Sequence, residues 1–192
     1  MAALKILVIP GSLRTGSLNA KLAAAAAYEF VQADAEVTRI SLGDFPLPIY
    51  DGDLQNKSGV PKNAINLKRM IGAHHGVLIV TPEYNSSVPP LVKNTIDWVT
   101  RVQDPHETRG QVFRERVFAI AAASESRLGG TRALAALRLI LSACRATVIP
   151  NQLALSFAGE AYDDMDRLKQ PVDVEALRAL VRQLIDFSQH MM

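Results

Sequence analysis

Hydrophobic runs and amphipathic stretches alternate along this chain. Runs of consecutive apolar residues, typical of strands buried on both faces, recur between stretches whose apolar residues lie three or four apart, the spacing of a helix. We predict strands over residues 5–9, 76–81, 117–123 and 147–155, and a weaker strand over residues 36–41. The strand over residues 147–155 is expected to bend or end near Pro150. The predicted helices cover residues 18–33, 60–73, 91–102, 131–145 and 173–189. Asp173 is the expected cap of the last helix, and residues 43–59, rich in Pro, Gly and Asp, are expected to form a loop.

Strands that alternate with helices predict an α/β fold, with a doubly wound five-stranded parallel sheet and helices on both faces. Residues 1–192 are expected to form one domain, because neither a linker nor a repeat interrupts the pattern. In such sheets ligands bind at the carboxyl ends of the strands, where the winding reverses. The loops after the first, third and fourth strands, "GSLRTGSLN", "PEYNSSVPP" and "SESRLGG", are therefore the expected site.

Charge and composition restrict the partners. The net charge is only +2 and there is no dense basic run, so nucleic acid is not an expected partner. No apolar stretch approaches the length of a membrane span. Cys144 is the single cysteine, which excludes an internal disulfide and fits a reducing compartment. We therefore expect a cytoplasmic protein that binds neither nucleic acid nor membranes.

The first of these loops does not match the common nucleotide-binding motifs. Gly11 and Gly16 have the spacing of a nucleoside-triphosphate loop, but Ser17 and Leu18 stand where the lysine and the magnesium-binding hydroxyl belong. Leu13 breaks the glycine pattern of a dinucleotide-binding loop. Two interpretations remain open from this loop alone: a site for one terminal phosphate, or an ordinary helix cap beside a solvated arginine.

The phosphate interpretation rests on the donors that the loop offers. A helix that begins near Ser17 presents free N–H groups and a partial positive charge. Ser12, Thr15 and Ser17 add hydroxyl groups, and Arg14 adds a full charge with bidentate geometry.

The second loop offers groups suited to a planar ring. Pro82, Glu83, Tyr84 and Asn85 follow a buried strand directly, and Pro82 restricts the direction in which the chain leaves the sheet. The next residues are able to present backbone N–H groups to a heterocycle, and Tyr84 is able to stack on it or cover it. The alternative is a plain turn with an exposed tyrosine.

These motifs, with "KNTIDW" after the second loop and the serine and paired glycines of the third, resemble the NADPH-dependent FMN reductase family. The resemblance covers the whole chain in order and implies a flavodoxin-like fold. It implies that Ser12, Arg14, Ser17 and Asn19 hold the FMN phosphate, that residues 82–85 line the isoalloxazine edge, and that Ser124 lies near the ring. The cofactor-binding residues that it implies are Gly11, Ser12, Arg14, Ser17, Leu18, Asn19, Pro82, Glu83, Tyr84, Asn85 and Ser124.

The resemblance also implies an enzymatic activity. NADPH or NADH would reduce FMN, which passes electrons to flavin, to quinones or to another small acceptor such as chromate. No catalytic side chain is expected, because the protein contributes placement and electrostatics. The alternative is a flavodoxin-type electron carrier that binds a redox partner protein. Such carriers are strongly acidic, whereas this chain has 21 Lys and Arg against 19 Asp and Glu, which favours the reductase.

Members of this family commonly pair through the region after the second loop, so a homodimer or homotetramer is implied. The apolar residues of that region, which would otherwise face water, are Tyr84, Val88, Pro89, Pro90 and Trp98. Trp98 is expected to be either a core residue or such an oligomer contact. The chain departs from the family pattern at Ser86 and Pro90, where glycine is frequent, and at Glu125-Ser126, where Pro-Gly is usual. These departures concern the access of substrate to the flavin more than the phosphate loop.

Other polar groups carry weaker signals. His74 and His75 are adjacent on a helix end, so their side chains diverge, and His106 and His190 have no partners at ligand spacing. We therefore predict no metal site. The charged segment 101–116 is expected to be a surface loop, the alternative being that it reaches a phosphate of the nicotinamide cofactor.

Overall fold

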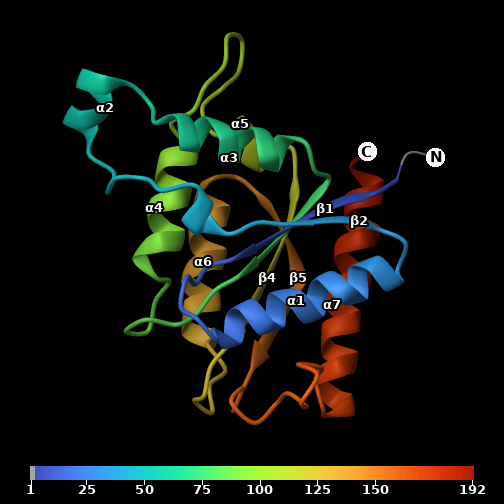
Figure 1. The fold of residues 1–192 in the computed structure, drawn as a ribbon. Coiled ribbons are helices and arrows are strands. Elements are labelled where there is room, and N and C mark those ends of the chain that lie inside the picture. Colours follow the sequence, from blue (N-terminus) through green and yellow to red (C-terminus); the bar gives the residue numbers. More distant parts are fainter. Residues whose placement is uncertain (1–2) are drawn as a thin grey trace.

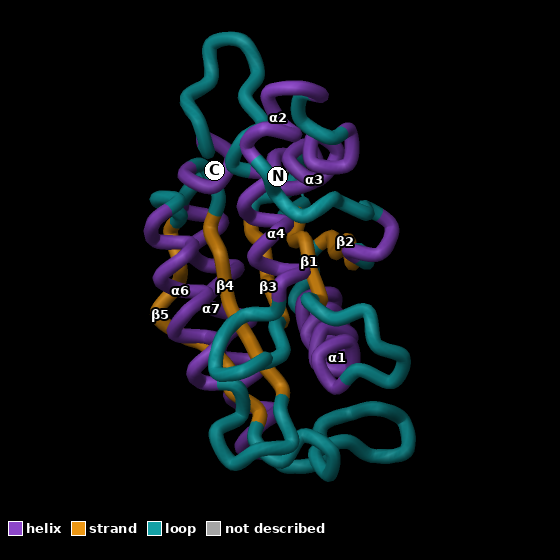
Figure 2. The backbone as a smooth tube through the Cα atoms, turned by 90° about the vertical axis from the view of Figure 1, so that its left-hand side faces the viewer, coloured by secondary structure: helices purple, strands orange, loops and turns teal. Residues whose placement is uncertain are grey.

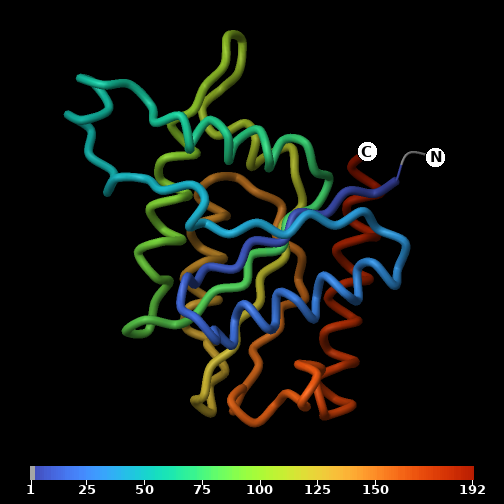
Figure 3. Tube along the Cα trace, viewed as in Figure 1, coloured from blue at the N-terminus to red at the C-terminus, as the bar shows by residue number. Residues whose placement is uncertain are grey.

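The computed structural model describes residues 3–192 and contains one five-stranded sheet. The strands are β1 (Lys5–Pro10), β2 (Glu36–Arg39), β3 (Gly76–Val80), β4 (Val117–Ala123) and β5 (Thr147–Leu155). They are all parallel and lie in the order β2-β1-β3-β4-β5, which can be followed by the labels in Figure 2. The chain moves outward from β1 to β2 and then back across β1 to β3, which Figure 3 traces by colour. This arrangement confirms the predicted doubly wound sheet, with its reversal of winding between β1 and β3.

Helices cover both faces of the sheet (Figures 1 and 2). On one face α1 (Leu18–Gln32) and α7 (Pro171–His190) pack against a core that includes Phe30 and Leu184. On the other face α3 (Lys62–Gly72), α4 (Pro90–Val99) and α6 (Thr131–Ala143) enclose a second core, which includes Leu67 and Leu137. The central strands β3 and β4 are buried along their whole length, as expected of a parallel sheet covered on both sides.

Three short elements lie in segments where the sequence predicted none: η1 (Leu42–Asp44), α2 (Gly52–Ser58) and α5 (Gln111–Arg114). The Asp51 side chain caps α2 by accepting hydrogen bonds from the N–H groups of Asp53 (2.7 Å) and Leu54 (3.3 Å). The helix ends at Gly59, whose φ of +75° favours glycine. Residues 43–59 are therefore only partly loop, because an Asp and a Gly at the right separation stabilise a short helix among Pro and Gly residues.

One expectation about a single residue was wrong, and for another residue the structure decides between two alternatives. α7 begins at Pro171, so Asp173 lies inside its first turn, and the preceding Gln170 makes no side-chain cap. Proline suits the first helical position because its missing N–H is not needed there. Trp98 is fully buried, and its Nε1 donates a hydrogen bond of 2.7 Å to the backbone oxygen of Pro48. Its ring also meets the ring of Tyr50 edge to face, with centroids 5.0 Å apart, so Trp98 belongs to the core and not to an exposed surface.

Candidate cofactor site

The loop from β1 to α1 is held at its start by close packing. The N–H of Gly11 donates a hydrogen bond of 2.7 Å to the backbone oxygen of Val80, at the end of the neighbouring β3. A Cβ on Gly11 would lie 2.4 Å from Cγ2 of Val92 on α4. Glycine is therefore required here because α4 approaches the loop too closely for a side chain. The effect is to place the loop beside the end of β3.

The start of α1 presents free hydrogen-bond donors. Ser17 caps the helix by accepting a hydrogen bond of 3.3 Å from the N–H of Ala20. The N–H groups of Leu18 and Asn19, in the first turn, have no acceptor within residues 3–192. A helix start with free N–H groups carries a partial positive charge and favours an anion. Gly16, with φ of +70°, allows the chain to turn into this helix.

Arg14 and Ser12 complete the group of donors. Arg14 is exposed, and its guanidinium makes no ion pair or hydrogen bond with residues 3–192. The Oγ of Ser12 lies 3.4 Å from the N–H of Arg14, which keeps the two residues together. A free cation, serine hydroxyls and free N–H groups thus gather at one helix start, and this combination fits a phosphate group.

The side chain of Asn19 has a structural task that the sequence did not indicate. Its Nδ2 donates to the backbone oxygen of Ala123, and its Oδ1 accepts from the N–H of Ala123, both at 2.9 Å. Asn19 is buried, and the two bonds join the start of α1 to the last residue of β4. Both polar atoms of this side chain are therefore used in hydrogen bonds within the protein, and the backbone N–H of Asn19 is the group left free for a ligand.

The second loop is anchored to α6 through Glu83. Its carboxylate accepts hydrogen bonds from the N–H groups of Arg132 (3.1 Å) and Ala133 (3.2 Å), and it forms an ion pair with the Arg132 side chain, whose Nε lies 2.7 Å away. Burial raises the pKa of Glu83, but the hydrogen bonds and charge of Arg132 and the N–H of Ala133 outweigh it and hold the pKa below its usual range. The carboxylate therefore stays ionised and caps α6.

The same loop turns sharply beyond Glu83. Tyr84 and Ser87 exchange backbone hydrogen bonds of 2.9 and 3.0 Å, and Asn85 and Ser86 between them have φ of 48° and 66°. Two left-handed residues are typical of the tight hairpin turn that usually contains glycine. Ser86 therefore stands at a strained position. The other departure in this loop, Pro90, occupies the first position of α4, which proline suits.

The three loops enclose a cleft of about 230 Å³ at the carboxyl ends of β1, β3 and β4. Its lining is Ser12, Arg14, Ser17, Leu18, Asn19, Pro82, Glu83, Tyr84, Ala123, Ser124 and Glu125. The structure thus brings together every implied cofactor-binding residue except Gly11 and Asn85, which shape the loops without lining the cleft.

Two lining residues, Ala123 and Glu125, were not among the predicted set. Ala123 carries no chemical signal in the sequence because it contributes through its backbone and its place at the end of a buried strand. Glu125 was detectable only as a departure from the usual Pro-Gly.

The cleft has the two kinds of surface that FMN requires. Arg14 and the start of α1 provide charge and hydrogen-bond donors for a phosphate. Pro82 and Tyr84 provide apolar surface for a planar ring, and Tyr84 is 50% exposed. The donors and the ring surface lie in one continuous cleft, so the residues present fit this cofactor.

Comparisons with known proteins agree with this geometry. The family described as NADPH-dependent FMN reductase matches residues 4–160. The chain is 38% identical over 139 residues to a quinone reductase of Escherichia coli, which covers 72% of this chain and 69% of that protein. It is 33% identical over 190 residues to an NAD(P)H-dependent FMN reductase of Pseudomonas aeruginosa, covering 94% of this chain and 97% of that one. The structure of FerB, a flavoenzyme NAD(P)H:(acceptor) oxidoreductase from Paracoccus denitrificans, superposes with a TM-score of 0.81 at 27% identity, covering 98% of this chain and 99% of that one.

Fold and site together define a flavodoxin-like oxidoreductase that uses FMN. The chain belongs to the NADPH-dependent FMN reductase family, and NAD(P)H is its electron donor. Among the helices of residues 3–192, none combines the length and apolar content needed to cross a bilayer.

Proposed function

We propose that this protein reduces quinones, and related small acceptors, with electrons from NADPH or NADH. The observation that carries the proposal is the free Arg14 guanidinium beside the unpaired N–H groups of α1, in one cleft with the exposed ring of Tyr84. Relatives named quinone reductase and 2-hydroxy-1,4-benzoquinone reductase support the acceptor class. Chromate is a further candidate acceptor, suggested by the family resemblance.

The residues of the chain bind and orient the cofactor. FMN, when bound, supplies the redox chemistry of the reaction. Arg14, Ser12 and the first turn of α1 would hold its phosphate, while Pro82, Tyr84 and Ser124 would border the ring. The Glu83 carboxylate is committed to Arg132 and Ala133, so it serves to fix the loop and not to move protons. No catalytic acid or base is assigned.

The substrate face of the cofactor would remain open to solvent. Tyr84 stands at the edge of the cleft on a strained turn, so it is placed to restrict which acceptors enter. Nicotinamide and quinone would then stack in succession on one flavin face, which predicts ping-pong kinetics.

Anaerobic spectroscopy tests the proposed function. FMN-loaded protein should lose its visible absorbance when NADPH or NADH is added and regain it when a benzoquinone follows, without any other protein. Comparing the two donors gives the nicotinamide preference, and a separate addition of chromate tests that acceptor. A flavin that stays oxidised with both donors, and is reduced only by a partner protein, would overturn the proposal in favour of an electron carrier.

We also propose that the protein forms a homodimer or homotetramer through the surface around the second loop. Tyr84 and Pro90 are exposed there, whereas Pro89 is buried and Val88 is half-buried. Apolar groups exposed beside a ligand cleft favour contact with a second copy. Light scattering of the FMN-loaded protein at micromolar concentration tests the assembly, and a monomer would contradict it. The single cysteine and the use of NAD(P)H support a cytoplasmic location.

A further inference from the structure

A second cavity, which we call the basic groove, lies between α4, α6 and the segment that joins α4 to α5. Its volume is about 570 Å³. α4 and α6 begin beside the cofactor cleft, and the groove extends to their far ends, at residues 100–101 and 144–145. Figure 1 shows the joining segment at the top of the view, whereas the loops of the cofactor cleft lie in the lower part. The groove is therefore separate from the cofactor site.

The lining of the basic groove carries a large excess of positive charge. Its cations are Lys93, Arg101, Arg109, Arg114 and Arg145, and its one acid is Asp97. Asp97 is already paired with Lys93, with a separation of 2.7 Å. Within residues 3–192, none of the four arginine side chains donates a hydrogen bond or forms an ion pair.

Arg101 shows the shortage of acceptors most clearly. Its Nε is buried and has no hydrogen-bond partner among residues 3–192. The guanidinium lies over the ring of Tyr50, with Cζ 4.6 Å from the ring centroid, and this contact positions the group without satisfying its N–H donors. A buried donor without an acceptor costs free energy. Within the described part of the chain Arg101 thus lacks a counter-charge, as do the other three arginines that line the groove.

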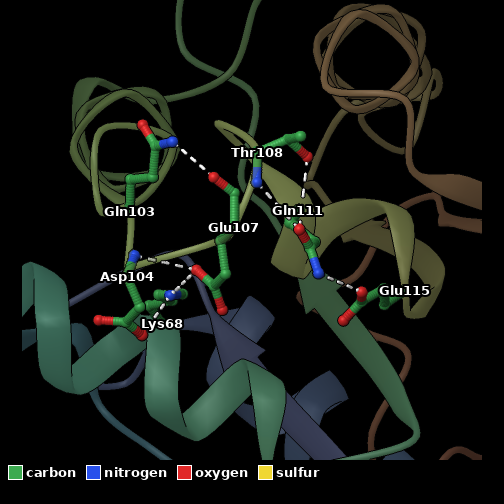
Figure 4. Close-up of polar contacts among 7 residues, drawn as sticks. All are labelled: Lys68, Gln103, Asp104, Glu107, Thr108, Gln111 and Glu115. Carbon is green, nitrogen blue, oxygen red and sulfur yellow. Dashed lines mark hydrogen bonds and ion pairs between the residues drawn. The ribbon is translucent and has the colours of Figure 1, made fainter.

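The acids closest in sequence to Arg109 are occupied elsewhere. Figure 4 shows Asp104 and Glu107 meeting Lys68 of α3. The Nζ of Lys68 is 2.6 Å from Oδ2 of Asp104, and the Lys68 side chain is only 7% exposed. This cluster fixes the joining segment to α3, and neither of its two carboxylates lines the groove. The arginines of the groove are thereby left without counter-charges from their own segment.

Arg145 occupies a backbone position that favours glycine. It follows the end of α6 with φ of 62°, and the N–H of the next residue, Ala146, bonds to the oxygen of Leu141 at 3.0 Å. This is the left-handed helix ending in which glycine is least strained. The chain thus places a long cationic side chain at the groove in spite of a backbone cost.

We propose that the basic groove binds a small anion that carries two or more negative charges on phosphate groups. A guanidinium group binds two phosphate oxygens at once, and four guanidinium groups around one cavity carry more positive charge than a single carboxylate would neutralise. Ile140, which is half-buried, also lines the groove and provides apolar surface for the rest of such a ligand. This site is independent of the FMN phosphate and does not rest on the proposed quinone reduction.

The single cysteine provides a direct measurement. Cys144 lines the groove, so a bound anion should slow the reaction of its thiol with a neutral disulfide reagent such as 4,4′-dithiodipyridine. Burial and the nearby Asp97 charge raise the pKa of this thiol, so the reaction is run at one fixed, alkaline pH in every sample. FMN-loaded protein is titrated with pyrophosphate and, separately, with ADP. We expect saturable protection by both; tighter protection by ADP would show that the apolar wall binds the nucleoside.

The Arg145→Gly variant separates ligand binding from folding. Glycine removes the steric strain of the left-handed backbone at residue 145, so the variant should unfold at an equal or higher temperature. Because one cation is lost, the pyrophosphate concentration that gives half of the maximal protection should rise about tenfold. As a control for backbone strain, Asp34→Gly places glycine at another left-handed residue, just after the C-terminal end of α1, where φ is 60°. As a control for charge, Arg182→Gln removes one cation from α7, on the other face of the sheet. Both controls should leave the protection unchanged.

Three results would overturn the proposal. They are the absence of protection at millimolar pyrophosphate, equal loss of protection in Arg145→Gly and Arg182→Gln, and protection that follows protein concentration instead of anion concentration. The last result would assign the groove to contact with a second copy of the chain. Failure of quinone reduction, by contrast, would leave the thiol measurement unaffected.

Discussion

The side-chain amide of Asn19 and the backbone of Ala123 form a reciprocal pair of hydrogen bonds, both 2.9 Å long. The two residues are 104 positions apart in the chain. Through this pair the first turn of α1, where the N–H groups of Leu18 and Asn19 have no acceptor among residues 3–192, is attached to the end of β4, which borders the same cleft. The cofactor loop is therefore positioned by the sheet as well as by its own turn.

Replacing Asn19 with leucine should destabilise the fold itself. The substitution leaves the N–H and the oxygen of Ala123 buried without their partner, which costs about 2–4 kcal/mol. Urea unfolding of the apoprotein measures this loss. Asn66→Leu on α3, where the side chain makes no hydrogen bond with residues 3–192, is the control. A midpoint equal to that of the control would show that the reciprocal pair contributes nothing to stability.

Arg14→Gln should weaken FMN binding without unfolding the protein. Loss of one charge-assisted contact to phosphate costs about 1.5–3 kcal/mol, a decrease in affinity of about tenfold or more. Riboflavin, which lacks the phosphate, should bind the variant and the parent equally. Fluorescence titration with both ligands measures the difference, and Arg69→Gln, an exposed arginine on α3 outside the cleft lining, is the matched control. Equal weakening of FMN and riboflavin would exclude Arg14 as a phosphate contact.

Ser86→Gly should stabilise the protein. Ser86 has φ of 66°, and glycine adopts this conformation without steric cost. The expected gain is about 0.5–1 kcal/mol, a rise of roughly 1–3 °C in Tm for a chain of this size. Ser87→Gly, at a position without positive φ in the same turn, should give no gain. A Tm that is unchanged or lower in Ser86→Gly would show that the turn is not strained.

The Glu83–Arg132 contact should make stability depend on acidic pH. The pKa of Glu83 is lowered in the folded protein, so its stabilising contribution is present above the ordinary value of 4.5 and is lost as the pH falls through the lower folded value. Glu83→Gln should therefore be clearly less stable than the parent at pH 7, and this difference should shrink below pH 4.5.

Urea midpoints from pH 7 to pH 3 measure this effect. Glu160→Gln, an exposed glutamate without an ion pair among residues 3–192, should show no such convergence. A constant difference between Glu83→Gln and the parent across this range would mean that the Glu83 charge is not the source of the stabilisation.

Local pattern was sufficient where an element is long or fully buried. The predicted strand 117–123 coincides with β4, because an unbroken apolar run has no other stable place than the interior of a covered sheet. The predicted strand 147–155 coincides with β5, although Pro150, Asn151 and Gln152 interrupt its apolar pattern and it is only partly buried. The short helix α2 was missed because Gly, Asp and Ser dominate its composition, and its stability depends on the Asp51 cap. The Asp173 cap was misplaced because a proline two residues earlier starts the helix.

The motifs of the sequence alone determined the loops that carry the site, since a doubly wound sheet brings the loops after its first, third and fourth strands to one edge. The tertiary structure decided the task of each side chain within them. The side chain of Asn19 is hydrogen-bonded to the backbone of Ala123, the Glu83 carboxylate to Arg132, and the Trp98 ring nitrogen to the backbone oxygen of Pro48. Each of these partners lies 49 or more residues away in the chain. The spacing of hydrophobic residues and the residue types of turns determine structure over only a few positions. These hydrogen bonds, by contrast, form only once the folded sheet has brought distant segments together.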